Sequence, residues 1–213
     1  MRVYHFLGKQ YGLESIEKRR LKISRITDLN DPFDFHAVYF PEKNLRKEFV
    51  RIIKELSSEN GLLCFSKSWH NPLMWSHYAD SHKGICLGFD VPDFPLNHVE
   101  YPHSRVDTTG MTVLTEDDVK TWICSKYKDW EYEDEVRAFF GLEDACPETG
   151  LYFADYSSDL HLREVMVGCK SDITRSDLDA VLGDEGEDII TFKTRPAFRT
   201  FHIVKNQNDK LWK

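Results

Sequence analysis

Several features that would assign this sequence to a function class are scarce or missing. The chain has five cysteines, which are scattered and form no Cys-x-x-Cys pair: Cys64, Cys86, Cys124, Cys146 and Cys169. Zinc sites need closely spaced ligand pairs, so this spacing argues against a metal. No apolar run approaches the ~20 residues of a membrane span, and Met1–Phe6 lacks the charged-then-apolar order of a signal peptide. We therefore expect a cytoplasmic protein with no membrane partner.

Glycine-rich phosphate loops are also missing from the chain. Neither a GxGxxG fingerprint nor a Walker loop occurs, and no linker, repeat or low-complexity segment interrupts the 213 residues. A domain of this length buries roughly 70% of the surface of its unfolded chain and is stable without disulfides. The sequence therefore predicts a single domain over residues 1–213.

Positive charge is in short supply. The net charge of −8 argues against an extensive, sequence-independent grip on nucleic acid, although a local basic groove stays open. The densest basic stretch, Lys18–Arg20 with Lys22, is more typical of a solvated helix end.

Hydrophobic periodicity and turn residues predict α+β structure with mixed or antiparallel sheets and flanking helices. Helices are expected at Leu13–Arg20, Glu42–Ser57, Pro72–Ser81, Glu116–Tyr127 and Ser176–Leu182. Strands are expected at Val3–Leu7, Leu21–Ile26, Leu62–Ser66, Ile85–Val91, Val99–Tyr101, Val136–Leu142, Leu151–Tyr156, Glu164–Val167, Ile189–Lys193 and Arg199–Val204. Because short strands dominate and helices do not alternate regularly with them, a doubly wound parallel sheet is disfavoured.

The segment Asn30–Asp34 is expected to be a turn, since Pro32 fixes its own φ and keeps Asp31 out of the helical region. Two roles stay open for it. Asp31 caps backbone N–H groups while Phe33 anchors the loop in the core, or the loop forms one wall of a pocket.

The first candidate site residues surround a strand entry. Glu133, Asp134 and Glu135 immediately precede the strand that contains Arg137, and strand alternation puts Glu135 and Arg137 on one face. A carboxylate at this point is rigid and can stabilise developing positive charge in a cleft. The alternative is a surface ion pair between Arg137 and Glu135 at a strand edge.

The second candidate group follows the strand Cys64–Ser66. Trp75 and Tyr78 lie three residues apart on the next helix and share a face with Ala79. Rings beside the hydroxyl of Ser66 would suit a planar ligand such as nicotinamide. A helix that packs its aromatic face into the core is the alternative. We expect the chemistry where these segments converge with Glu133–Arg137.

Other constellations are weaker. The spacing of His70, His77 and His82 does not place all three on one helical face, so a metal site is disfavoured. A Cys64–His36–Asp34 triad is also disfavoured, because a thiol in an apolar strand has a raised pKa and is a poor nucleophile.

The order of several motifs resembles a large bacterial family known only as a domain of unknown function. The motifs that carry the resemblance are Asn30–Phe33, Cys64–Ser66, Met74–Ala79, His82–Ile85, Val99–Tyr101, Lys126–Arg137 and Glu164–Gly168. That resemblance implies no activity by itself.

A second resemblance, to ADP-ribosyltransferases, implies one. Those enzymes carry a basic or His residue on the first strand, then a Ser-containing strand or helix Tyr, then a Glu at the start of a later strand. Tyr4–Phe6, Cys64–Ser66 and Glu133–Glu135 come in that order, although Cys-Phe-Ser replaces the usual Ser-Thr-Ser. The resemblance implies a split β core and NAD as the substrate, with an unknown acceptor, either protein or nucleic acid.

The same resemblance implies residue roles. His5 would hold the nicotinamide-side ribose or the diphosphate, and Ser66 would support the site. Trp75 and Tyr78 would pack on nicotinamide. Arg137 joins the NAD-binding group. Glu135 would bond the ribose 2′-hydroxyl, and Glu133 would orient or deprotonate the acceptor.

Three functions stay open. The first is transfer of ADP-ribose from NAD, and the second is a domain that binds a nucleotide without chemistry, in which Glu135 is the partner of Arg137. The third is a nucleic-acid-processing or toxin-like effector, for example in phage defence.

Overall fold

The computed structural model describes residues 1–92, 95–183, 188–208, 210 and 212. It is a mixed α and β structure with both parallel and antiparallel strand pairs, as the sequence predicts. The chain divides into two compact units, and each is made of separate chain segments. The first unit contains Met1–Leu21, Phe65–Phe94 and Ala154–Lys213, and the second contains Lys22–Cys64 and Pro95–Phe153. A single domain over residues 1–213 stays a prediction.

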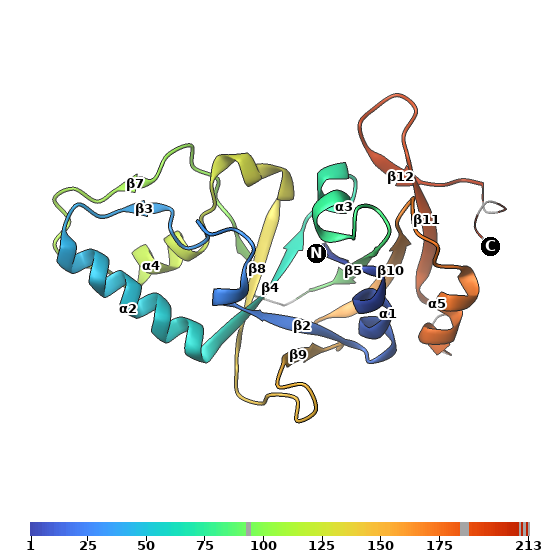
Figure 1. The fold of residues 1–213 in the computed structure, drawn as a ribbon, viewed down its shortest axis with the longest axis horizontal. Coiled ribbons are helices and arrows are strands. Elements are labelled where there is room, and N and C mark those ends of the chain that lie inside the picture. The colour runs from blue at the N-terminus through green and yellow to red at the C-terminus, as the bar shows by residue number, and fades with distance from the viewer. Residues whose placement is uncertain (93–94, 184–187, 209, 211, 213) are drawn as a thin grey trace. The chain divides into compact units, whose positions relative to one another are not determined.

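The first unit is built on a sheet with the strand order β12-β11-β10-β5-β1 (Figure 1). Its elements are β1 (Arg2–Leu7), α1 (Lys9–Glu17), α3 (Pro72–Tyr78), β5 (Ile85–Asp90), β10 (His161–Val167), α5 (Arg175–Leu182), β11 (Ile190–Pro196) and β12 (Ile203–Lys205). β10 and β11 are parallel, whereas β1 and β5 are antiparallel. β5 is buried from Ile85 to Phe89 and β10 from Val165 to Val167, which agrees with the apolar sequence of these segments.

A left-handed turn connects α3 to β5. Asp80, Ser81 and His82 all have positive φ, at 46°, 53° and 71°. Consecutive left-handed residues cannot continue a right-handed helix, so α3 ends at Tyr78 and not near Ser81 as expected. The N–H of Gly84 then donates to the carbonyl of Ala79 at 2.8 Å.

The second unit contains the long helix α2 (Lys43–Glu59). Its other elements are η1 (Ile26–Asp28), β3 (Val38–Tyr39), β6 (Asn97–His98), β7 (Val106–Asp107), α4 (Glu116–Ile123), the 3-10 helix η2 (Lys128–Glu133) and β8 (Glu135–Gly141). Three strands have residues in both units: β2 (Arg20–Arg25), β4 (Asn60–Ser66) and β9 (Tyr152–Asp155). Within the second unit, β8 pairs with β4 and β6, and β3 and β7 form a separate parallel pair.

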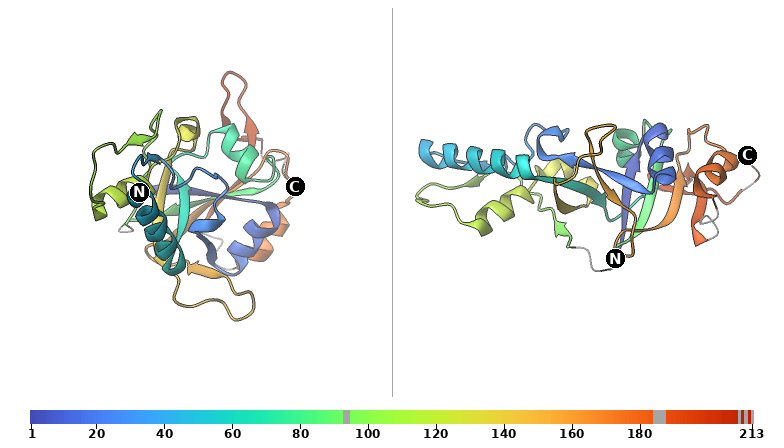
Figure 2. Two further views of the ribbon diagram at one scale, coloured as in Figure 1. Left: turned by 60° about the vertical axis from the view of Figure 1, so that its left-hand side comes forward. Right: turned by 90° about the horizontal axis from the view of Figure 1, so that it is seen from below.

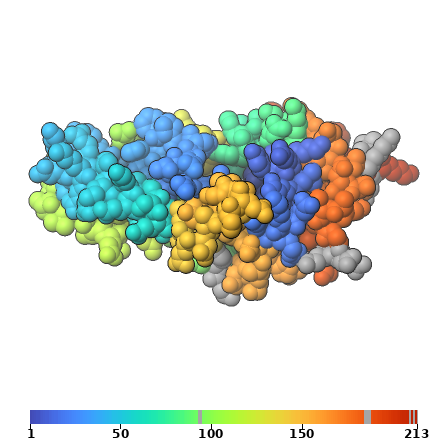
Figure 3. All heavy atoms as spheres, turned by 60° about the horizontal axis from the view of Figure 1, so that its bottom comes forward, coloured from blue at the N-terminus to red at the C-terminus, as the bar shows by residue number. Residues whose placement is uncertain are grey.

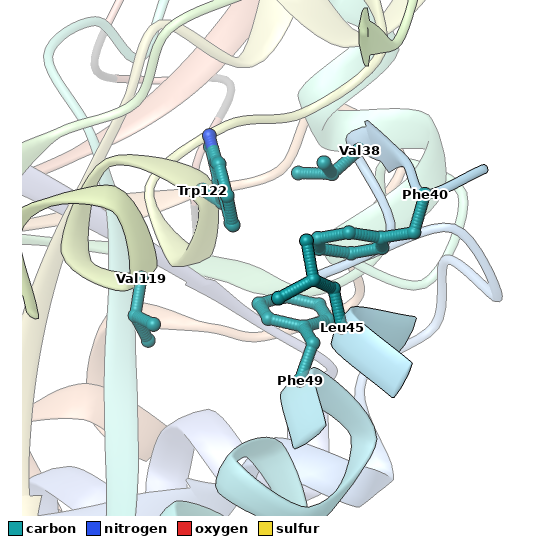
Figure 4. Packing of buried hydrophobic residues seen from close by; sticks show 6 residues of the cluster. All are labelled: Val38, Phe40, Leu45, Phe49, Val119 and Trp122. Atoms are coloured by element: carbon teal, nitrogen blue, oxygen red, sulfur yellow. The ribbon is translucent and has the colours of Figure 1, made fainter. Parts of the chain in front are cut away.

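The core of the second unit lies between α2 and α4. Phe40 and Phe49 both pack on Trp122, with ring centroids 5.5 and 5.6 Å apart (Figure 4). Val38, Leu45 and Val119 complete the buried cluster. The space-filling view shows α2, in light blue and teal, with the lime-green segment that includes α4 along it (Figure 3).

The N-terminus of α4 matches its prediction. The Thr115 hydroxyl accepts from the N–H of Asp118, and the Asp118 carboxylate accepts from the N–H of Thr115, which completes a capping box. The helix ends at Ile123 and not at Tyr127, because Cys124 leaves the helical conformation with φ −107° and ψ 27°. The residues from Lys128 to Glu133 then form a separate 3-10 helix.

Two predicted strands are wrong in part. Val99–Tyr101 is not a strand: Glu100 makes only an isolated bridge with Ser125, and the strand of this region is β6, two residues earlier. The final strand begins at Ile203, because Arg199–His202 belong to the loop that joins it to β11. Alternating apolar residues were the signal for both predictions, and that signal does not distinguish strands from extended loops.

Among the described residues, no helix combines the length and apolarity needed to span a bilayer. No group of three or more His, Cys, Asp or Glu side chains in this part of the chain is placed to hold a metal ion.

Candidate functional site

Arg137 is the centre of a buried charged cluster in the second unit. Its Nε donates to Glu135 Oε1 at 2.8 Å, and one terminal nitrogen donates to Asp34 Oδ1 at 2.7 Å. The other terminal nitrogen donates to the carbonyl of Ile123 at 2.8 Å. The guanidinium also lies over the Phe35 ring, 5.3 Å from its centroid. The shared face of Glu135 and Arg137 is thus confirmed.

Lys126 extends the cluster to the second glutamate. Its ammonium bonds Glu133 at 2.6 Å and lies 3.6 Å from Glu135 and 3.8 Å from Asp34. The ring of Trp130 stacks against it, with the Nζ atom 4.6 Å from the centroid. Both charged side chains of the Lys126–Glu133 pair are buried, so the five charged groups form a network within the protein.

Glu133 and Glu135 reach the same cluster because of the residue between them. Asp134 has φ 45° and ψ 53°, in the left-handed region. It ends η2, and β8 begins at the next residue. Asp tolerates this conformation better than most residues with a Cβ atom. The backbone N–H of Glu135 donates to the Tyr101 hydroxyl at 2.8 Å, which fixes the start of the strand.

Burial and neighbouring charges shift the pKa values of two carboxyl groups in the cluster, in opposite directions. Burial acts to raise the pKa of Glu135, but the charge and hydrogen bonds of Arg137, with help from Lys126, lower it below its ordinary value. Burial raises the pKa of Asp34, and Arg137 and Lys126 offset this only in part. Three carboxyl groups face two cations in this network. A raised pKa on one carboxyl is the expected response to that excess.

Cys64 lies against the cluster, where its surroundings disfavour the thiolate that a nucleophile requires. Burial raises the pKa of its thiol well above the ordinary value, and the Glu135 carboxylate raises it further. The third member of the disfavoured triad, Asp34, is occupied by Arg137. The expectation of a raised Cys64 pKa is confirmed.

A pocket of about 320 Å³ opens beside residues of this cluster. It is lined by Phe33, His36, Ala37, Pro102, His103, Ser104, Arg105 and Tyr127. The two largest rings are well exposed, with 57% of Phe33 and 50% of Tyr127 accessible. The guanidinium of Arg105 lies over Phe33, 5.5 Å from its centroid. No acidic side chain is among the residues that line the pocket.

The charged cluster holds the walls of this pocket in place. Phe33 and His36 flank Asp34, Pro102 follows Tyr101, and Tyr127 follows Lys126. Each of those three anchors contacts the cluster: Asp34 bonds Arg137, Tyr101 bonds Glu135, and Lys126 bonds Glu133. The backbone N–H of Lys128 also donates to the carbonyl of Pro102 at 3.1 Å. Segments that lie far apart in the sequence are therefore joined by buried polar contacts.

The turn at Asn30–Asp34 shows the capping part of its first open role together with the second role, a wall of the pocket. The carboxylate of Asp31 accepts from the N–H of Phe33 at 2.9 Å, as expected for a capping turn. The expectation that Phe33 is anchored in the core is wrong, since more than half of the ring is exposed and lines the pocket.

The remaining predicted site residues belong to the first unit. Ser66 is buried, and its hydroxyl both donates to the carbonyl of Ser68 and accepts from its N–H. The His5 ring meets the edge of Phe65, with centroids 5.6 Å apart. These contacts give both residues structural roles in their own unit. Their contact with NAD stays a prediction.

The helix aromatics of the first unit differ from each other in exposure. Trp75 is completely buried, meets Phe6 edge-on at 5.3 Å and donates from its indole nitrogen to the carbonyl of Trp69 at 2.7 Å. This is the core-packing role that the sequence left open as the alternative. Tyr78 is half-buried on the same helix. The convergence of this helix with Glu133–Arg137 stays a prediction.

The sequence did not predict two members of the cluster, Asp34 and Lys126, or the contact that Tyr101 makes with it. Asp34 is 103 positions from Arg137, and no single-sequence pattern links residues so far apart. The motif Lys126–Arg137 did contain a signal, because it holds both cations and both glutamates of the network.

Comparison with known proteins adds one finding. Residues 74–105 match a family model described as Protein of unknown function (DUF2971). That match supports the resemblance to a domain-of-unknown-function family over the segment that contains α3, the left-handed turn and β5. It also reaches the pocket wall at Pro102–Arg105. No curated protein and no solved structure matched the chain.

Proposed function

We propose that the second unit binds an anionic nucleotide in the pocket between Phe33 and Tyr127. The observation that carries the proposal is the lining of the pocket, with two exposed rings, an arginine, two histidines and no acid, in a chain of net charge −8. Aromatic faces hold a planar base, and Arg105 is suited to a phosphate because its planar donors match phosphate oxygens. The volume lies within the range of small-molecule sites, about 300–1,000 Å³.

The charged cluster supports this binding function without taking part in chemistry. Glu135 already uses both carboxylate oxygens on Arg137, at 2.8 and 3.2 Å. In this proposal it is the partner of Arg137, and the network keeps the pocket walls in place for the ligand.

The test is calorimetric titration of the protein with NAD, ATP and AMP. We expect saturable binding of at least one of them, weakened about tenfold or more in Phe33→Ala and Arg105→Gln, since each change removes one favourable contact. Tyr39→Ala is the matched control, because Tyr39 is an exposed ring of the same unit outside the pocket. No saturable heat with any of the three, or equal binding by all variants, would contradict the proposal.

A second proposal is that the nucleotide is NAD and that its nicotinamide–ribose bond is cleaved, with ADP-ribose passed to an acceptor. Its support is that Arg137 lowers the pKa of Glu135, which is therefore an anion at neutral pH. An anion there would stabilise the positive charge that develops on the ribose as nicotinamide leaves with the bonding electrons. To reach the ribose 2′-hydroxyl, Glu135 would have to exchange its contact with Arg137.

Nicotinamide release distinguishes the two proposals. Transfer or hydrolysis predicts release by the wild type and at least about a hundredfold slower release by Glu135→Gln. NAD binding without release in either protein supports the binding function alone. A toxin-like effector predicts in addition that expression inhibits growth and that Glu135→Gln relieves the inhibition.

A further inference from the structure

A second surface of interest lies in the first unit, at the loop between β11 and β12. This loop, residues 197–202, stands out from its strands in Figure 1 and in the left view of Figure 2. Phe198 and Phe201 are 91% and 95% exposed. Exposed apolar side chains that gather in one place mark interaction sites.

The loop holds its shape without burying these rings. The N–H of Ala197 donates to the carbonyl of His202 at 2.8 Å, which closes the base of the loop. The guanidinium of Arg195 lies over the Phe198 ring, 4.3 Å from its centroid, and donates to the carbonyl of Pro196. A defined backbone thus presents the rings outwards.

Other rings continue from the loop toward the body of the unit. Trp69 and His70 stack with centroids 4.0 Å apart and an interplanar angle of 31°. His70 lies 6.2 Å from His202, and its Nδ1 atom contacts the carbonyl of Ile203 at 2.8 Å. The N–H of Ile203 donates in turn to the carbonyl of His70.

The two chain segments that carry these rings contain basic residues and no acidic ones. Between Ile190 and Asn206 the sequence has no Asp or Glu, and its basic residues are Lys193, Arg195, Arg199 and Lys205. The segment from Phe65 to Ala79 is also free of acid. These are local cationic segments in a chain whose net charge is −8, so they complement an anionic partner.

We propose that this surface binds single-stranded nucleic acid, with unpaired bases stacked on Phe198 and Phe201 and phosphates held by Arg199 and its basic neighbours. Exposed rings interleaved with arginine and lysine are what a sequence-tolerant strand requires, because every base has a face that stacks. The rings extend from the loop to Trp69 and are not confined to the tip, which favours a strand over a lipid surface. None of the residues of this surface is among those that line the nucleotide pocket.

The test is fluorescence anisotropy with a labelled oligothymidine of about 20 nucleotides, long enough to span such a surface, at about 50 mM salt. We expect saturable binding that weakens as salt is raised. The double variant Phe198→Ala/Phe201→Ala should bind about tenfold more weakly or worse, because stacking on each ring is lost. Arg199→Glu should weaken binding and reduce its dependence on salt.

Two control variants separate these effects from general ones. Tyr11→Ala removes an exposed ring of the first unit outside the surface, and Lys47→Glu makes the same charge change on the exposed face of α2. Both should bind like the wild type, and a duplex of the same length should bind more weakly because its bases are already stacked. All the substituted side chains are exposed, so the variants should keep the circular dichroism spectrum of the wild type.

Three results would overturn the proposal. The first is no saturable binding by the wild type at low salt. The second is binding that the phenylalanine double variant leaves unchanged. The third is adsorption to vesicles containing phosphatidylserine that the same variant abolishes, with no binding of the oligonucleotide, since the surface would then be a membrane contact.

Discussion

Arg137 makes hydrogen bonds with side chains of two different segments and with one main-chain carbonyl, and it is fully buried. A buried cation of this kind is retained only when its partners compensate for lost hydration, and the partners depend on it in the same way. The integrity of the second unit should therefore be more sensitive to this residue than to any exposed charge.

Arg137→Met should lower the free energy of unfolding by roughly 3–5 kcal/mol, because it leaves the buried carboxyl groups of Glu135 and Asp34 with only the more distant Lys126 ammonium, at 3.6 and 3.8 Å, as a cation. Urea denaturation measures the change. Arg163→Met is the matched control: Arg163 pairs with Asp90 at 3.2 Å, but both side chains are more than one third exposed. Such a pair contributes about 0–1 kcal/mol. Equal losses of unfolding free energy in the two variants would mean that the buried cluster stabilises the fold no more than an exposed ion pair does.

The cluster also predicts a pH dependence. Because the pKa of Glu135 is below its ordinary value of 4.5 in the folded protein, its contribution is complete above that pH and disappears as pH falls through the folded pKa. The difference in unfolding free energy between the wild type and Glu135→Gln should be constant near neutrality. Below pH about 4.5 it should shrink, by at most about 1.4 kcal/mol per pH unit.

Asp34→Asn provides the control of opposite sign. The pKa of Asp34 is raised from 3.8, so its ionisation disfavours the folded state, and the wild type should lose stability relative to this variant as pH rises through the titration. If the difference in unfolding free energy from the wild type changes with pH in the same direction for both variants, overall charge, and not the cluster, determines the stability in acid.

At the scale of elements, the loop that follows α3 is the most constrained segment of the first unit. A Cβ atom on Gly168 would lie 2.2 Å from the carbonyl oxygen of His82, the last residue of the left-handed turn. The N–H of Gly168 also donates to the carbonyl of Gly84 at 2.9 Å. The end of β10 can therefore approach the turn only with a glycine at this position.

Gly168→Ala should destabilise the protein by about 1–3 kcal/mol, since two backbone segments must separate to admit the methyl group. Thermal unfolding followed by circular dichroism measures the loss. Gly141→Ala is the control, because its Cβ atom would meet nothing closer than 3.5 Å. An alanine at 168 that is tolerated as well as one at 141 would contradict the close approach.

The same scale shows what the sequence can and cannot predict. The long helix α2 was placed to within two residues, because its apolar positions recur over four turns and Asn60–Gly61 end it. The α3 boundary was wrong, because no proline or glycine marks the left-handed run of Asp80, Ser81 and His82. Short β3 and β7 were missed, since two residues carry no periodicity.

The residues of the candidate site were predicted where they are close in sequence and missed where only the fold brings them together. Glu133, Glu135 and Arg137 were found because they are close in sequence and strand alternation relates two of them. Asp34 and Tyr101 reach the cluster through tertiary contacts alone. The pocket was foreseen only as one role of the Asn30–Asp34 turn, because its other walls come from segments that carry no motif.

At the scale of the whole molecule, β2, β4 and β9 each have residues in both units. A strand loses its hydrogen bonds along its whole length when its sheet melts, so we expect one cooperative unfolding transition, in agreement with the predicted single domain. Scanning calorimetry should give equal calorimetric and van't Hoff enthalpies. Two resolved transitions would show that the units are separate domains.

The pocket of the second unit is formed by chain segments that lie far apart in the sequence and come together only in the folded protein. Its occupancy is therefore linked to the fold: a ligand that binds the native chain and not the unfolded one stabilises it by RT ln(1 + [L]/Kd). At a hundred times the dissociation constant this amounts to about 2.7 kcal/mol. A melting-temperature screen of metabolite libraries would consequently report a physiological ligand even when no reaction is known to assay.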